Sequence, residues 1–370
     1  MAAPPPPPAP TEVQQTEFKC GGCGATLQYS PGTTMLKCPY CGRENELQMT
    51  GAPILEHDLT ELNVVPHTTA QGFGTAVREF KCNRCGATTT LAGAEMATRC
   101  AFCGSDVVVE TPPAPNMIRP ESVLPFAIDK NNATQRFQGW IRGLWFRPSN
   151  LKRMAGLAKL DGMYAPHFTY DANAHSNWRG EAGHYYYDTE WVTIQGRRQS
   201  RQVRKVRWVH KAGVHDFFYD DELVCASRGL PLPIVKKIYP FHLNALVPYA
   251  PQFLSGFGAE AYTVDPREGW QTAQVAMRQK EAEACRRLLG GDTQRNLQVN
   301  TTLYKPTFKH LLLPVFVAAY VYGAKTYRFM VNGQTGEVQG EAPISWAKVG
   351  AVVGGIVLAL VAITKLASLW

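Results

Sequence analysis

The chemistry that the sequence offers is concentrated in eight cysteines, which form four Cys-x2-Cys pairs near the amino terminus. The first two pairs follow the pattern Cys-x2-Cys-x14-Cys-x2-Cys, and the next two repeat it at an offset of 62 residues. Two residues between the members of a pair let both sulfurs face one ion, and two such pairs can complete a tetrahedron. The predicted ligands are Cys20, Cys23, Cys38 and Cys41 in one site, and Cys82, Cys85, Cys100 and Cys103 in the other.

Zinc is the metal that this pattern favours. Four thiolates leave no open coordination position, so two structural Zn²⁺ ions are expected rather than catalytic ones. A module of about 26 residues buries too little apolar surface to fold alone, and a structural zinc supplies about 10–16 kcal/mol. A glycine follows the second cysteine of each pair, which allows a tight turn of the backbone. Iron in a rubredoxin-like site and redox-active dithiols are the alternatives.

The charge of the chain is unevenly distributed. The formal net charge is +8, but residues 1–110 carry a net charge of −4 and the remainder carries +12. Two zinc ions with four thiolates each would make the amino-terminal region more negative still. Because nucleic-acid affinity comes from cationic neutralisation of phosphates, this favours protein contact for the cysteine modules. Basic side chains near the cysteines, such as Lys81 and Arg84, leave nucleic-acid binding as the alternative.

The chain divides into short modules followed by one large domain. MAAPPPPPAP has neither the basic region nor the apolar region of an export signal, so the cysteines are expected to stay in a reducing compartment. The linker TPPAPNMIRPE contains four prolines and indicates a domain boundary. The expected organisation is a Pro-rich lead (1–16), zinc ribbon 1 (17–43), a connector (44–78), zinc ribbon 2 (79–105), a Pro-rich linker (106–121), an α+β domain (122–342) and a transmembrane helix (346–370).

The large domain has the pattern of an α+β fold with an antiparallel sheet. An apolar stripe predicts a first helix through Phe137 and Ile141, and RPSNLKRMAGLAKLDG predicts a second. From residue 163 to about residue 227, aromatic and β-branched residues predict several strands with breaks at QGRR and KAGV. Asp265 as cap, Pro266, and Gly290 at the end predict a long helix. VFVAAYVY-GAK-TYRFMV predicts a hairpin.

The carboxyl-terminal segment predicts a membrane span. Residues 349–364 contain no charge, and 349–370 would form a helix of about 33 Å, enough to cross a bilayer core. Lys365 lies near one end, where it can snorkel, and Trp346 and Trp370 bracket the span. The expected protein is single-pass in the inner (cytoplasmic) membrane, with the bulk of the chain cytoplasmic. A buried carboxyl-terminal helix is the alternative, and Gly350-x3-Gly354 makes a homodimer a further candidate.

No catalytic set is recognisable in the sequence, and an enzyme is not expected. RRQSRQVRKVRWVHK (197–211) holds seven basic residues, which suit a solvated hairpin edge, anionic lipid or phosphates. His210 and His215 flank the expected KAGV turn, and Asp220 and Asp221 follow; these residues suit either strand ends or a metal or acid–base site. Cys225 and Cys285 are expected to be buried structural thiols. The chain contains no GxxxxGK[ST], GxGxxG, GxSxG or HExxH motif.

Three stretches, CGATLQYSPGTTMLKCPYCG, GFGTAVREFKCNRCGA and VNGQTGEVQGEAPISW, resemble a bacterial family of transcription factor IIB-type, primosomal helicase-like, double zinc-ribbon membrane proteins. The resemblance covers most of the chain beyond the Pro-rich lead. It implies zinc at the eight cysteines, a membrane helix at 349–370, and partners among flotillin-like or phage-shock-type membrane proteins. Two features of the sequence differ from what this family name implies. Lys365 interrupts the span, and the nucleotide-binding loop of a helicase motor is missing.

These patterns together predict a membrane-anchored zinc-ribbon scaffold or adaptor that presents two structural sites to protein partners. Anionic lipid is a further candidate ligand. A membrane-tethered nucleic-acid-binding protein of transcription or replication is the alternative function.

Overall fold

A computed structural model of the chain describes most residues between Phe18 and Ala367. The described residues are 18–47, 53–61, 72–73, 77–92, 100, 102, 104–105, 108–111, 117–148, 160–194, 197–322 and 325–367. The Pro-rich lead lies outside them, as does most of the segment expected to form the second helix (147–162), whose last two residues belong to a strand. The fold is α+β and mostly sheet, as expected.

A sheet of twelve strands organises the molecule, and it is mixed rather than antiparallel as expected. Two of its strand pairs, one between residues 258–259 and 163–164 and one between 311–312 and 122–123, are parallel. Three of its strands are far longer than an ordinary strand of about 5–6 residues: β9 (Asp161–Ile194), β10 (Arg197–Cys225) and β13 (Thr293–Tyr322). β10 and β13 pair antiparallel with opposite edges of β9. The shorter strands outside the cysteine modules are β4 (His57–Asp58), in the expected connector, and β8 (Ser122–Val123), β11 (Val247–Pro248), β12 (Gly258–Glu260), β14 (Lys325–Asn332) and β15 (Val338–Gly340).

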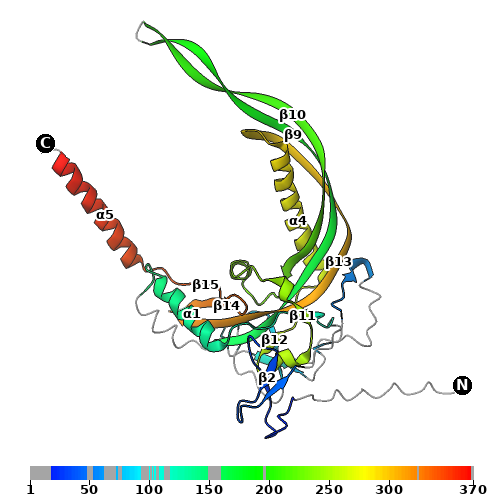
Figure 1. Cartoon of the computed structure of the whole chain (residues 1–370). Helices are drawn as coiled ribbons and strands as arrows, with labels where there is room; N and C mark the ends of the chain where they lie inside the picture. Colours follow the sequence, from blue (N-terminus) through cyan, green and yellow to red (C-terminus); the bar gives the residue numbers. More distant parts are fainter. Residues whose placement is uncertain are drawn as a thin grey trace.

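The three long strands leave the body of the molecule together as a curved arm, with α4 (Pro266–Leu289) lying along one face (Figure 1). α4 begins and ends where its sequence signals predicted. The Asp265 carboxylate accepts a hydrogen bond from the Arg267 N–H at 2.8 Å, and Gly290 ends the helix with φ +68°. The buried positions of α4 recur every four residues and contact the strands: Ala273, Met277, Glu281, Cys285 and Leu289.

The body is held together by aromatic packing between helix and sheet. α1 (Lys130–Gly143) places Phe137 against Phe329 of β14, with ring centroids 3.6 Å apart and planes nearly parallel. Phe126 stacks on Phe257 at 4.2 Å and meets Phe316 of β13 edge-on at 4.9 Å. The short helices among the described residues are η1 (Leu59–Glu61), in the expected connector, and α3 (Leu232–Val235), η2 (Leu243–Ala245) and η3 (Pro251–Leu254) in the large domain.

The expected break at KAGV is wrong, because residues 211–214 lie inside β10 and continue its pairing with β9. Gly213 is there for packing rather than for a turn. A Cβ at this position would come within 2.7 Å of the Trp178 indole, which lies across it from β9. The break expected at QGRR agrees with the structure, since β9 ends at Ile194 and β10 begins at Arg197. The predicted β13–β14 hairpin is confirmed, with Tyr322 paired to Lys325.

The two cysteine modules are built from short antiparallel strands. In the first, β1 (Gln28–Tyr29), β2 (Met35–Lys37) and β3 (Glu44–Glu46) form a separate sheet. In the second, β5 (Val77–Cys82), β6 (Thr88–Ala92) and β7 (Val108–Thr111) extend the large sheet through β12. β7 lies within the interval expected to be a linker and adds a third strand to this module.

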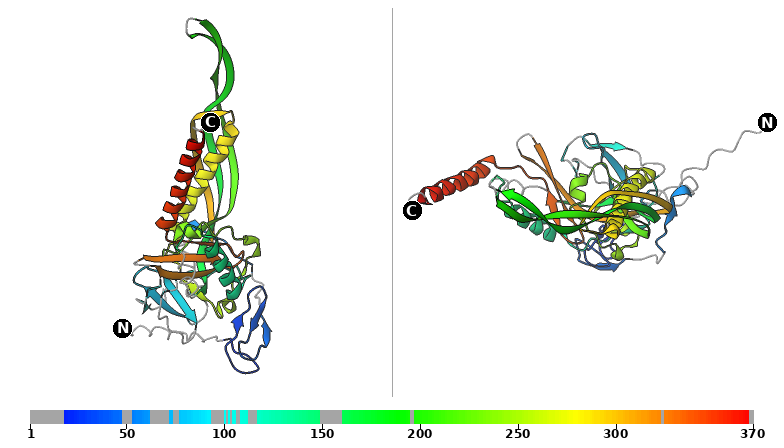
Figure 2. Two further views of the ribbon diagram at one scale, coloured as in Figure 1. Left: turned by 90° about the vertical axis from the view of Figure 1, so that its left-hand side faces the viewer. Right: turned by 90° about the horizontal axis from the view of Figure 1, so that it is seen from above.

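α5 (Trp346–Ala367) extends away from the body as a single isolated helix (Figure 1). Seen from two directions, α5 and the arm leave the body on the same side, whereas the first cysteine module lies on the opposite side (Figures 1 and 2). The molecule therefore has one end that carries the apolar helix and another that carries cysteines.

Candidate metal centres

The described residues of the four Cys-x2-Cys turns share one glycine conformation and one pattern of backbone hydrogen bonds. The glycine after each pair has a positive φ between +68° and +76°, a conformation that side chains with a Cβ rarely adopt. The N–H of each glycine donates to the carbonyl of the first cysteine in its pair, at 2.8–3.0 Å. The N–H of that cysteine donates to the carbonyl of the residue after the glycine, at 2.8–2.9 Å. The glycines are Gly24, Gly42, Gly86 and Gly104.

In the first module, these turns bring four sulfurs together. The Sγ atoms of Cys20, Cys23, Cys38 and Cys41 all lie within 4.8 Å of one another. Cys20 Sγ is 3.5 Å from Cys41 Sγ, and Cys23 Sγ is 3.5 Å from Cys38 Sγ. A tetrahedral zinc with Zn–S bonds of about 2.3 Å would hold its sulfurs about 3.8 Å apart. The donor set and the spacing therefore fit a structural zinc ion.

The backbone of the turns favours the thiolate form that a metal requires. The backbone N–H groups of Gly22 and Cys23 lower the pKa of Cys20, and hydrogen bonding by the Cys41 N–H lowers the pKa of Cys38 to about 6. The pKa of Cys23 is raised to about 11. Its bond from the Ala25 N–H is outweighed by the neighbouring sulfurs, Cys38 foremost, and by burial. A bound cation would relieve that crowding of negative charge.

The second module brings together the three of its cysteines that are described. Cys82, Cys85 and Cys100 have Sγ atoms within 4.8 Å of one another, and Cys85 Sγ is 3.7 Å from Cys100 Sγ. Cys103 lies outside the described residues, although Gly104 beside it has the backbone conformation of the other three turns. The two centres therefore share one design, and each could hold a metal ion.

The modules are fastened to the body in different ways. In the first, the Tyr29 N–H donates to the Ser255 carbonyl at 2.9 Å, and the Tyr29 ring meets Phe253 edge-on at 5.2 Å. In the second, β6 pairs with β12, so that Thr90 lies opposite Ala259 and its Oγ1 donates to the Ala259 carbonyl at 2.8 Å. Both centres are thus held in fixed positions on the body, an arrangement that the cysteine spacing did not predict.

The histidines considered as ligands are not brought together. His210 Nδ1 lies 4.0 Å from a Glu181 carboxylate oxygen, and His215 Nδ1 lies 2.8 Å from a Glu281 oxygen. Among the described residues, neither belongs to a group with metal-binding geometry. Cys225 and Cys285 are buried, as expected, and burial raises the pKa of Cys225 to about 12.

A group of three carboxylates, Asp171, Asp220 and Asp221, also lies within 4.8 Å, and Asp171 was not anticipated from the sequence. Lys309 Nζ already supplies a positive charge there, at 2.6 Å from Asp221 and 3.1 Å from Glu56. Burial, followed by hydrogen bonding with Glu56, raises the pKa of Asp171 to about 7. The group is therefore best explained as an ion-pair cluster that fixes β13 to β9 and β10.

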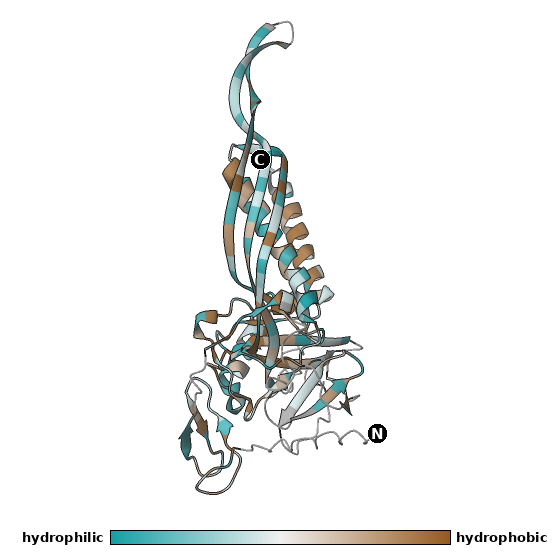
Figure 3. Ribbon diagram, turned by 90° about the vertical axis from the view of Figure 1, so that its right-hand side faces the viewer, coloured by the Kyte–Doolittle hydropathy of each residue, from teal (hydrophilic) through white to brown (hydrophobic). Residues whose placement is uncertain are grey.

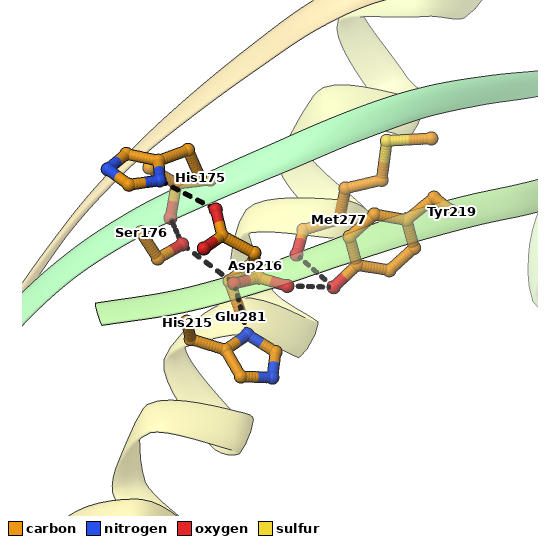
Figure 4. A network of polar contacts seen from close by, with 8 residues as sticks. His175, Ser176, His215, Asp216, Tyr219, Met277 and Glu281 are labelled. Atoms are coloured by element: carbon orange, nitrogen blue, oxygen red, sulfur yellow. Dashed lines mark hydrogen bonds and ion pairs between the residues drawn. The ribbon is translucent and has the colours of Figure 1, made fainter. Parts of the chain in front are cut away.

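A buried carboxylate joins α4 to the arm (Figure 4). Glu281 is fully buried and accepts hydrogen bonds from Ser176 Oγ at 2.7 Å and from the Tyr219 hydroxyl at 2.8 Å, while His215 approaches at 2.8 Å. Burial alone would raise the pKa of Glu281, but these partners, His215 foremost, lower it. No local sequence pattern indicates this network, because its members lie on three elements.

α5 is the candidate membrane segment. Residues 346–365 form a helix long and apolar enough to cross a membrane, and none of its most apolar window is buried against the rest of the chain. Its base is attached to the turn after α1, where Lys348 Nζ donates to the Arg147 carbonyl at 2.7 Å. The alternative of a buried carboxyl-terminal helix does not describe this structure.

The chain is similar along nearly its whole length to a protein of Bacillus subtilis (strain 168) named "Uncharacterized protein YdjG". The two are 25% identical over 352 residues, which cover 93% of this chain and 96% of the relative. No protein-family profile matches the chain, and no solved structure matches it. The similarity therefore extends over most of both chains rather than over the cysteine modules alone.

Proposed function

We propose that this protein is a membrane-anchored scaffold that presents two structural zinc ribbons to protein partners at the cytoplasmic face of the membrane. The proposal rests on one observation: α5 and the first cysteine module lie at opposite ends of the molecule (Figures 1 and 2). An apolar helix leaves one side of the body with its most apolar window not buried against the described chain, and the first cysteine module lies on the other side (Figure 2). A bilayer around α5 would leave that module accessible.

The orientation follows from chemistry and charge. Four-thiolate zinc sites persist where thiols stay reduced, which is the cytoplasmic side. Lys348 and Arg147 lie at the base of α5, and basic residues next to a span favour that same side. The protein is therefore proposed as a single-pass protein of the inner membrane with its bulk in the cytoplasm.

A scaffold role fits rigid, paired sites. Each module is tied to the body by backbone hydrogen bonds, so a partner that binds both modules would find them already in position. The first module also exposes an aromatic side chain: Tyr40, in the turn between Cys38 and Cys41, is 83% exposed. Assignment to the double zinc-ribbon family, and flotillin-like or phage-shock-type partners, belong to this same proposal.

The test is purification of the full chain from native membranes with its partners. Cys82→Ser/Cys85→Ser is expected to lower the metal content by one ion per chain and to lose partners, while carbonate-resistant membrane attachment remains. Cys20→Ser/Cys23→Ser serves as the matched variant in the other module. Unchanged partners in both variants would contradict the scaffold, and release by carbonate would contradict the anchor.

A second measurement on the same protein distinguishes the scaffold from the nucleic-acid-binding alternative. Duplex DNA is titrated with the detergent-solubilised full chain at several salt concentrations. Tight binding with a steep salt slope would favour the alternative, because the slope reports how many phosphates are neutralised. Weak binding is expected here.

A further inference from the structure

The end of the arm is a two-stranded hairpin, and at its base the Asp292 carboxylate accepts a hydrogen bond from the Tyr185 N–H at 2.8 Å. The last pair between β13 and β9 joins Thr293 to Gly183, and α4 ends at Leu289. Beyond that point, β9 and β10 continue alone through residues 184–194 and 197–207, here named the distal hairpin. None of its described side chains is buried. A lone two-stranded ribbon is marginal in water, which points to a surface that supports it.

The two faces of the distal hairpin differ in chemistry. Residues directly opposite each other across a ladder share a face. One face, here called the aromatic face, has the pairs Tyr185–Val206, Tyr187–Arg204, Thr189–Gln202, Trp191–Ser200 and Thr193–Arg198, without a carboxylate. Both acidic residues, Asp188 and Glu190, lie on the other face, where Lys205 bridges them at 2.7 and 2.9 Å.

The aromatic side chains of that face are exposed to solvent. Tyr187 is 67% exposed and Trp191 is 68% exposed, and the Arg204 guanidinium lies 4.4 Å above the Tyr185 ring. Tyr and Trp beside arginine are typical of the interface between a bilayer and water, where the rings sit at headgroup level and the cations meet lipid phosphates. Tyr186, 47% exposed, lies on the other face beside the carboxylates, so the faces differ in where the acidic residues lie. Edge protection alone would require charges, but it would not require that both carboxylates be confined to one face.

The position of the distal hairpin supplies the second argument. The arm leaves the body on the same side as α5, and its end curves toward the side on which that helix lies (Figure 1). A bilayer that holds α5 therefore meets the hairpin. The hairpin is mostly hydrophilic (Figure 3), and its open strand edges cannot enter hydrocarbon, so it must lie along the headgroups.

We propose that the aromatic face of the distal hairpin docks on the anionic headgroup surface of the bilayer that holds α5. This inference rests on the anchoring part of the proposed function. Docking would give the body two attachments, one through α5 and one through the arm, and would limit its rotation about the helix.

The test places a photo-reactive residue on each face of the hairpin in the full chain. Thr189→p-benzoylphenylalanine samples the aromatic face and Val192→p-benzoylphenylalanine the opposite face. Each protein is reconstituted in phosphatidylcholine vesicles with or without phosphatidylglycerol. Crosslinking to lipid is expected at position 189, to rise with phosphatidylglycerol, and to fall with added salt. Equal yields at 189 and 192, or crosslinks from 189 to protein alone, would overturn the proposal.

Two arginine pairs give matched variants with the same loss of charge. Arg198→Gln/Arg204→Gln acts on the aromatic face and is expected to lower the docking equilibrium roughly 25-fold, at about fivefold per arginine. Arg201→Gln/Arg207→Gln acts on the opposite face and is expected to keep most of the crosslinking. The proposal fails if the two variants behave alike.

Carbonate extraction of the same vesicles separates this proposal from the anchor. If α5 resists extraction while position 189 finds no lipid, docking is wrong and the anchor stands. If carbonate releases the protein although position 189 crosslinked to lipid beforehand, the hairpin binds lipid and the anchor is wrong. Loss of both would overturn both.

Discussion

Tyr40 is the most exposed large hydrophobic side chain among the described residues, at 83%. It lies in the turn that supplies Cys38 and Cys41, so its backbone is held by the metal centre while its ring faces solvent. Exposed, rigidly held tyrosines are common anchors of protein interfaces.

We therefore expect Tyr40→Ala to weaken partner binding by about 2 kcal/mol, roughly 30-fold, without changing metal content. The measurement is quantitative recovery of partners from membranes, alongside metal analysis. Tyr304→Ala, which removes an exposed tyrosine from β13, is the matched control and should recover as much partner as the wild type. Equal recovery with both variants would remove Tyr40 from the interface.

At the centre of the sheet, two neutral histidines make the arm sensitive to acid. His167 and His310 are fully buried on the adjacent strands β9 and β13, and burial lowers the pKa of each to about 4. Above pH of about 6.5, both are neutral whether the protein is folded or unfolded. Between about pH 6.5 and 4, the unfolded chain binds protons that the folded protein cannot, so stability is lost as the pH falls.

The expected loss is up to about 1.4 kcal/mol for each histidine and each pH unit below 6.5. Hydrogen exchange of the β13 amides at about pH 7 and about pH 5 measures it. His310→Asn can keep the hydrogen bond to the Ile118 carbonyl and should reduce the loss. Because the wild type and the variant are compared at the same pH, any effect of metal release on exchange is the same in both and cancels. The same pH slope in both would show that His310 does not titrate as described.

At the scale of elements, α4 depends on one buried carboxylate. Glu281→Ala would leave Ser176, His215 and Tyr219 without their common acceptor. We expect the arm to lose about 3 kcal/mol of local stability, because two buried hydroxyl groups and a partly exposed histidine lose a charged partner. Hydrogen exchange in α4 and β9 should accelerate while the cysteine modules keep their metal. Glu283→Ala, an exposed position on the same helix, should leave exchange unchanged.

The sequence predicted those elements whose signals are local. The capping residues and glycines predicted where α4 begins and ends, and the cysteine spacing predicted that the four sulfurs of the first centre lie together. The strand break predicted at Gly213 was wrong, because a glycine that makes room for Trp178 looks the same in the sequence as a glycine that makes a turn. The lengths of β9 and β13 were also missed. Their continuity depends on pairing between segments far apart in the chain, which residue alternation within one segment does not reveal.

At the scale of the whole molecule, the distances from the membrane should differ between the two ends. A donor fluorophore carried on a non-natural residue is placed at Tyr40 or at Thr189, with acceptor lipids in the surrounding vesicle. Energy transfer is expected to be strong from position 189 and weak from position 40, because the first module lies away from α5 and the arm (Figure 2). Similar transfer from both positions would contradict this orientation.

The pairing of β9 with β13 also constrains how the protein can be made. β9 ends at Ile194 and β13 begins at Thr293. At about 5–20 residues per second, a ribosome needs roughly 5–20 s to synthesise the intervening chain. Throughout that interval, one side of β9 offers unpaired N–H and C=O groups to any neighbouring nascent chain. Yield in overproducing cells should therefore depend on translation speed and chaperone supply more than on the stability of the finished protein.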